Sequence, residues 1–170
     1  MRSNDKKALE RYQKKLEFAK NSGGVNAFET KQEKTDRIEK AKKDYAFMVS
    51  YYFPHYATSK TADFQIKFAK KVKLKKTYKG FCRWGRGLAK SVHNDILIPF
   101  WLWMQGEPVY LVIISTSNDR AVQLLEDLQV EFEANPRIIA DFGEQKSLGN
   151  WEEDLLGKLL EIGNLKGDYV

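Results

Sequence analysis

Residues 81–95 read FCRWGRGLAKSVHND, and this stretch decides which fold the sequence predicts. A short apolar run leads into Gly85-Arg86-Gly87, and Lys90-Ser91 follows shortly after. A phosphate-binding loop uses backbone N–H groups at the start of a helix, glycines where side chains would collide with phosphate, a Lys for charge and a Ser or Thr for a metal ion. Trp84 and Ala89 replace the two glycines of the usual G-x-x-x-x-G-K-[ST] spelling. The alternative is a surface turn followed by a helix with a solvated lysine.

The segments on either side of this loop indicate an α/β arrangement. Tyr78–Trp84 has the composition of a short strand, and a helix is expected from about Ala89 to Trp103, with Pro99 as a kink. Val109–Ser115 (VYLVIIS) is a continuous β-branched run, as expected for a strand that is buried on both faces. The order strand, loop, helix, strand predicts a short parallel sheet with right-handed crossovers.

The remaining segments have apolar residues at helical spacing. The first half of the chain predicts helices at about 4–20, 31–52 and Thr61–Val72. After the second expected strand, Asn118 is a good N-cap for a helix that stops before Pro136. Stripes of this kind are typical of core packing and carry no functional information of their own.

The composition limits the classes of protein and of site. The chain has 170 residues and a single cysteine, Cys82, which excludes an internal disulfide and a multi-cysteine zinc site. The longest apolar run, Ile96–Met104, is shorter than the roughly 20 residues that a bilayer span needs. Because residues 1–20 are also charged, we expect a cytoplasmic protein without membrane contact.

The net charge of +6 conceals two halves of opposite sign. Residues 1–100 hold 24 Lys and Arg against 10 Asp and Glu, a balance of +14, whereas residues 101–170 hold 5 against 13, a balance of −8. A basic half of this size can attract a polyanion such as DNA. The alternative is a solvated, charge-rich helical surface.

Several short motifs occur in the order and spacing of a known family. YFPH (52–55), RGLAKS (86–91), IPFWLW (98–103), EFEANPRIIADFG (131–143) and WEED (151–154) together resemble the start of the ATPase domain in tailed-phage terminase large subunits. One group of these proteins has an R-G-x-A-K-S loop. The resemblance covers roughly residues 45–155 and implies a partial P-loop NTPase fold of the α/β class, with a short parallel sheet and an N-terminal helical extension.

The resemblance also implies an activity and site residues. It implies a motor that hydrolyses ATP to move double-stranded DNA, in which Lys90 holds the β- and γ-phosphates and Ser91 holds Mg²⁺. Arg86 would be the catalytic residue that stabilises charge on the γ-phosphate. Gln65 would contact adenine, or is simply exposed polar surface. The other nucleotide-binding residues that it implies are Gly85, Gly87, Leu88 and Ala89.

Two features of such motors are missing from the sequence. Hydrolysis needs an apolar strand that ends in Asp-Glu, and Ile138–Asp141 is too short for one. The family's nuclease domain is absent as well, so the resemblance implies a fragment, or a shortened phage or prophage gene in a bacterial host. Whether such a chain hydrolyses ATP is left open.

The resemblance divides the chain and suggests its partners. Residues 1–57 would form the helical extension, 58–155 the partial ATPase domain and 156–170 an unassigned tail. The small terminase subunit, the portal and further copies of the chain are the implied partners. Two other hypotheses remain: a non-catalytic basic DNA-binding or assembly module, based on the Lys-rich segment 67–79, and an unrelated small P-loop kinase. In any of them, an incomplete sheet would leave an unpaired edge that favours self-association.

Overall fold

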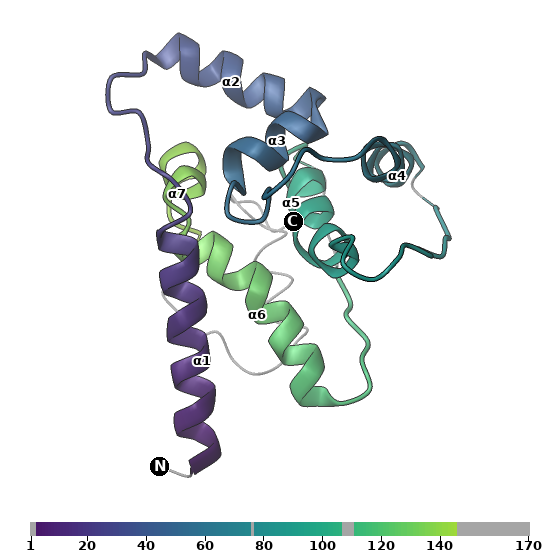
Figure 1. The fold of residues 1–170 in the computed structure, drawn as a ribbon. Coiled ribbons are helices and arrows are strands. Elements are labelled where there is room, and N and C mark those ends of the chain that lie inside the picture. The colour runs from purple at the N-terminus through teal and green to yellow at the C-terminus, as the bar shows by residue number, and fades with distance from the viewer. Residues whose placement is uncertain (1–2, 76, 107–110, 146–170) are drawn as a thin grey trace, which may run out of the picture.

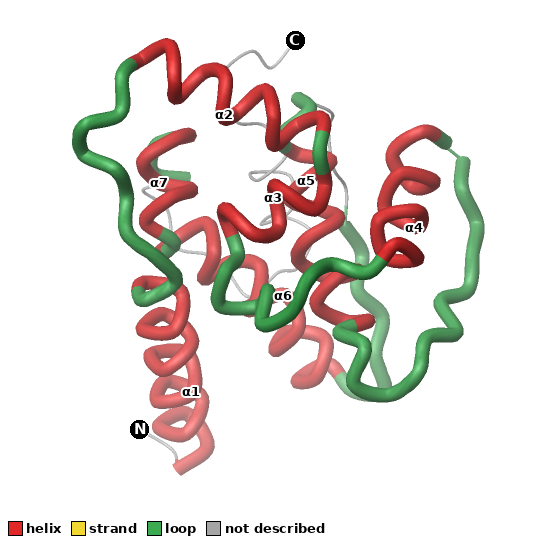
Figure 2. Tube along the Cα trace, turned by 45° about the horizontal axis from the view of Figure 1, so that its top comes forward, coloured by secondary structure: helices red, strands yellow, loops and turns green. Residues whose placement is uncertain are grey.

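The structure consists of helices joined by loops. The computed structural model describes residues 3–75, 77–106 and 111–145, and within these ranges it contains no strand (Figures 1 and 2). The helices are α1 (Ser3–Lys20), α2 (Lys31–Lys43), α3 (Tyr45–Tyr52), α4 (Asp63–Leu74), the π-helix η1 (Val92–Leu97), α5 (Ile98–Trp103), α6 (Asn118–Ala134) and α7 (Pro136–Phe142). The predicted α/β P-loop fold with a parallel sheet is therefore wrong for the described part of the chain.

Neither expected strand forms in the part of the chain that the structure describes. The segment Tyr78–Trp84 is irregular, and its run of apolar residues is interrupted by Lys79, Gly80 and Arg83. Of Val109–Ser115, the first two residues lie outside the described ranges, and the rest forms no strand. A strand is stable only when its N–H and C=O groups pair with a neighbour. Strand-forming composition alone therefore did not produce a sheet.

The observed helices agree more closely with those predicted from the sequence, except that one predicted helix is divided into two. The helix expected at 31–52 is divided at Asp44, whose backbone is extended (φ −112°, ψ 104°). The Asp44 carboxylate accepts from the Phe47 N–H at 3.1 Å and so caps α3. The helices expected at 4–20 and Thr61–Val72 are confirmed as α1 and α4.

Pro99 shapes the helix that follows the loop. The expected helix begins at Lys90 and contains η1, in which the Ile98 N–H donates to the His93 carbonyl oxygen five residues back. Pro99 has no N–H, so the regular ladder is interrupted directly after this bond. The π-helix η1 ends directly before Ile98-Pro99, so the irregular turn lies next to the position where the sequence predicted a kink.

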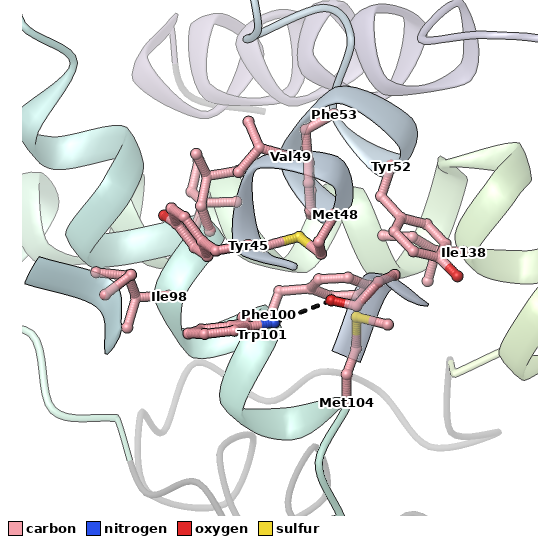
Figure 3. Close-up of a cluster of buried hydrophobic side chains, with 14 of the residues drawn as sticks. Tyr45, Met48, Val49, Tyr52, Phe53, Ile98, Phe100, Trp101, Met104 and Ile138 are labelled. Carbon is pink, nitrogen blue, oxygen red and sulfur yellow. Dashed lines mark hydrogen bonds between the residues drawn. The ribbon is translucent and has the colours of Figure 1, made fainter. Parts of the chain in front are cut away.

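The main core is aromatic and joins α3, η1 and α5 to α6 and α7. Trp101 lies at its centre, and the Trp101 indole N–H donates to the Ala41 carbonyl oxygen at 3.0 Å (Figure 3). The largest side chains that are fully buried with it are Tyr45, Tyr52, Phe53, Phe100 and Phe132. This cluster includes residues on both sides of position 57, and the predicted domain division remains a prediction.

Helix α1 lies along α6 (Figure 1). Ala19 of α1 is buried against Val130 and Ala134 of α6. Lys15 adds an ion pair with Asp127 at 2.6 Å. None of the helices in the described ranges has the length and apolar character that crossing a membrane requires.

A buried polar cluster connects the turn after α3 to α6 and α7. The Glu131 carboxylate is fully buried and accepts from His55 Nε2 at 2.7 Å and from Asn135 Nδ2 at 2.8 Å. Asn135 also donates to the Tyr52 carbonyl oxygen at 2.8 Å. The Asn135 side-chain oxygen caps α7. The motifs YFPH and EFEANPRIIADFG, far apart in sequence, thus meet in this cluster.

Substituting Asn135 tests the importance of the cluster. We expect Asn135→Ala to lower the free energy of unfolding by about 3 kcal/mol, because a helix cap is lost and two buried acceptors lose a donor. Ser117→Ala is the matched control, since Ser117 caps α6 at an exposed position and its loss should cost about 1 kcal/mol. Urea denaturation measures both, and equal losses would show that capping alone accounts for the role of Asn135.

Candidate phosphate-binding loop

The loop Trp84–Ser91 is anchored by aromatic packing against α4 and η1. The Trp84 ring contacts Phe64 and Phe68 of α4 edge-on, with centroid distances of 5.1 and 5.5 Å. On its other side it contacts His93 at 5.6 Å. Trp84, which stands at the first glycine position of the usual motif, therefore packs the loop against α4 and η1.

The backbone of the loop turns sharply before the helix begins. Gly87 has φ +83° and Ala89 has φ +51°, the left-handed region in which an L residue other than glycine costs roughly 1–2 kcal/mol. Ala89 stands where the usual motif has its second glycine and adopts a conformation that glycine favours. Its carbonyl oxygen accepts the first helical hydrogen bond, from the His93 N–H at 3.0 Å.

The Lys90 side chain folds back across this turn. Its ammonium donates to the Trp84 carbonyl oxygen at 3.4 Å while Lys90 itself is solvent-exposed. Lys90 and Ser91 form the first helical residues, so unbonded N–H groups and a positive charge lie at the same end of the helix. This combination suits an anion.

Gln65 is close to the loop and supports it. Its side-chain oxygen accepts from the Ala62 N–H at 2.8 Å, and its nitrogen donates to the Leu88 carbonyl oxygen at 3.2 Å. A cavity of about 170 Å³ lies beside this contact and is bordered by residues 58–62 and 87–89. Both ends of the amide are engaged with the protein backbone, and the predicted adenine contact remains a prediction.

The other predicted residues lie on the outer surface of the loop. Gly85, Arg86 and Leu88 are exposed. Ser91 is exposed on the first helical turn and lines a larger cavity of about 630 Å³ between η1, α1 and α6. Asp95 lines the same cavity, where burial, with the neighbouring Asp127 charge as a smaller cause, raises its pKa to about 6.

The side chains of both histidines are enclosed by the protein: His93 is buried, and the His55 side chain is 6% exposed. His93 lies under Trp84, and its Nδ1 is 2.7 Å from the Tyr45 hydroxyl. Burial lowers the pKa of His93 to about 4, so its ring is neutral at pH 7. His55 bonds to Glu131. The sequence contains one local indication of the buried polar cluster: Glu131 and Asn135 are four residues apart, which places them on the same face of a helix.

The described residues contain no group of three or more His, Cys, Asp or Glu side chains that could hold a metal ion. An ion at the loop would need ligands from the nucleotide itself, as Mg²⁺ does when it is bound through phosphates. The Ser91 hydroxyl is exposed at the helix start, and its predicted role as a protein ligand of Mg²⁺ remains a prediction.

Cations surround the loop. Residues 60–94 contain 11 Lys and Arg and a single acidic residue, Asp63. Within the described ranges, none of these cations forms an ion pair with a carboxylate. We call the exposed ones the basic surface: Lys60, Lys67, Lys70, Lys71, Lys75, Lys79, Arg83, Arg86 and Lys90.

Glycine substitutions test whether the loop conformation is required. A Cβ at Gly87 or at Gly24 would meet no atom within 4 Å, but only Gly87 has positive φ. We expect Gly87→Ala to destabilise the chain by about 1 kcal/mol through backbone strain. Gly24→Ala should be neutral or slightly stabilising. Urea denaturation compares them, and equal effects would contradict the left-handed turn.

Comparison of the chain with models of protein families, with curated proteins and with solved structures finds no match. Inference about function therefore depends on the residues of the loop, the charges around it and the motifs of the sequence.

Proposed function

We propose that the chain binds ATP through the loop Trp84–Ser91, as the nucleotide-binding front part of a viral DNA-packaging ATPase similar to terminase large subunits. The observation that carries this proposal is the position of Lys90, whose ammonium lies across a left-handed turn at the start of a helix. Phosphate binding at this loop does not require a sheet, because free N–H groups and a cation at a helix N-terminus can hold an anion.

In this proposal, each of four loop residues has a separate role in binding the phosphates and Mg²⁺. Lys90 and Arg86 are exposed cations without a carboxylate partner in the described ranges, so neither would have to break an ion pair to bind phosphate. Gly87 leaves space for an approaching ligand. Mg²⁺, bound with the nucleotide and held by Ser91, would neutralise charge on the phosphate oxygens.

Hydrolysis by this chain should be slow. An acidic residue that activates water and a second carboxylate for the metal are needed for rapid phosphoryl transfer. In the sequence, no apolar run of strand length ends in Asp-Glu. We therefore propose binding of ATP as the function of the loop and expect little turnover.

Calorimetric titration with Mg²⁺ and ATP tests this proposal. We expect Lys90→Ala to weaken ATP binding by at least about tenfold, because a charge-assisted phosphate contact is worth about 1.5–3 kcal/mol. Lys67→Ala removes an equally exposed lysine from α4 and should leave the affinity unchanged. Undetectable binding by the wild type, or equal affinity of both variants, would refute the loop assignment.

A second candidate function is non-catalytic DNA binding, and the basic surface favours it. Its cations follow one another in the sequence of α4 and of the segment that leads to Lys90. Figure 2 shows the path of α4 and of the loop that follows it. Aromatic residues alternate with them, and Phe81 is 95% exposed. Rows of free cations attract phosphates, and exposed aromatic rings can stack on bases.

Salt titration distinguishes this function from ATP binding. Each phosphate contact contributes about 0.9 to the slope of log affinity against log salt for duplex DNA. We expect Lys67, Lys70 and Lys71 changed together to Gln to reduce that slope by about 2–3, measured by fluorescence anisotropy. Lys6, Lys7 and Lys14 of α1, changed together to Gln, are the control for lost charge. An equal reduction by both triple variants would indicate unspecific attraction, and this candidate would then be rejected.

A further inference from the structure

A cavity of about 630 Å³ between α1, η1 and α6 plays no part in the functions proposed above. Its volume lies within the range of about 300–1,000 Å³ that is typical of small-molecule sites. Apolar side chains from all three helices and from the turn after α3 line it: Phe18, Tyr56, Val92, Ile96, Leu124 and Val130. Phe18 remains 49% exposed although it is aromatic. A ligand with an apolar body would therefore be stabilised by covering this ring.

Asp95 of η1 contributes an unpaired carboxylate to the cavity. Among the described residues, no hydrogen-bond donor or cation is bonded to it. It is partly buried, and burial, with the Asp127 charge as a smaller cause, raises its pKa to about 6, which leaves it ionised at pH 7. A carboxylate that is partly withdrawn from water without a donor is unfavourable, so a cationic partner stabilises it more than it would a hydrated carboxylate.

The cations that border the same cavity have less to gain from a ligand. Arg11 and Lys15 of α1 already form ion pairs with Glu126, at 3.2 and 3.1 Å. Lys7 and Lys14 are exposed, and an exposed, hydrated charge gains little from a surface ion pair. The unpaired carboxylate therefore decides which sign of charge the cavity prefers in a ligand.

We propose that this cavity binds an organic ammonium ion with an apolar body, in which the ammonium pairs with Asp95 and the body covers Phe18. The Tyr56 ring contacts Phe18 edge-on at a centroid distance of 5.6 Å, and the faces of aromatic rings also attract cations. The proposal does not depend on ATP binding, because neither Asp95 nor Phe18 belongs to the loop Trp84–Ser91.

Three probes with the same carbon chain test the preferred charge: hexylammonium, hexanol and hexanoate. Each is titrated into the ¹⁵N-labelled full chain, and the backbone amide signals of residues 91–97 are followed by NMR. We expect hexylammonium to bind at least about tenfold more tightly than hexanol, because it adds a charge-assisted hydrogen bond to the same apolar contact. Hexanoate should bind most weakly, because its charge repels that of Asp95.

Variants test whether Asp95 and Phe18 are responsible. Asp95→Asn keeps the size of the side chain and removes its charge, so the affinity for hexylammonium should fall by at least about tenfold while that for hexanol stays the same. Asp63→Asn, at an exposed position on α4, is the matched control and should change neither. Phe18→Ala should weaken the binding of both probes, whereas Phe28→Ala, at a 94% exposed position, should not.

Each result decides for or against the proposal. Preferential binding of hexylammonium that depends on Asp95 and Phe18 supports it. A wild type that binds no probe at millimolar concentration overturns it, as does equal affinity for all three, a preference for hexanoate, or an ammonium preference that Asp95→Asn leaves unchanged. Thermal unfolding followed by circular dichroism checks the fold of each variant. Asp95→Asn should be at least as stable as the wild type at pH 7, because it removes a partly buried charge without a partner.

Discussion

The buried carboxylate of Glu131 is the constraint on which the rest of the structure depends. A carboxylate removed from water is unstable unless donors surround it. Glu131 obtains them from His55, which follows α3, and from Asn135, which caps α7. The Tyr56 side chain lies near this carboxylate, and burial together with the Glu131 charge raises the pKa of its hydroxyl. These donors are available only when α3, α6 and α7 are packed together, so the polar cluster depends on the same packing as the aromatic core.

The position of the candidate loop follows from the same packing. Tyr45 of α3 reaches His93, His93 supports the Trp84 ring, and Trp84 is held from the other side by α4. A loop that sits on packed aromatic rings keeps its shape without a sheet beneath it. The proposed phosphate contacts by Arg86 and Lys90 would thus be made by exposed side chains on a firmly supported turn.

The sequence predicted the helices better than the strands. A helix forms its hydrogen bonds within one segment, whereas a strand needs a second strand beside it. The spacing of apolar residues predicted α1, α4 and α6 closely, because each helix satisfies its own backbone. The break at Asp44 was not foreseen, since an acidic cap inside an apolar stripe is a weak signal. Tyr78–Trp84 had strand-like composition, but no neighbouring strand is present among the described residues to pair with it.

For the candidate site, the sequence by itself determined the local elements: the glycine turn, the helix that starts at Lys90, and the cations around them. Only the tertiary structure decided that Gln65 bonds to Leu88, that His93 is buried and that His55 bonds to Glu131. These outcomes depend on contacts between distant segments; His55 and Glu131 are 76 residues apart. The hydrogen bonds of helices and caps join residues that are close in sequence, so the sequence predicts them. Burial of a charged side chain and pairing of a strand require contacts with distant segments, and only the tertiary structure shows which segments those are.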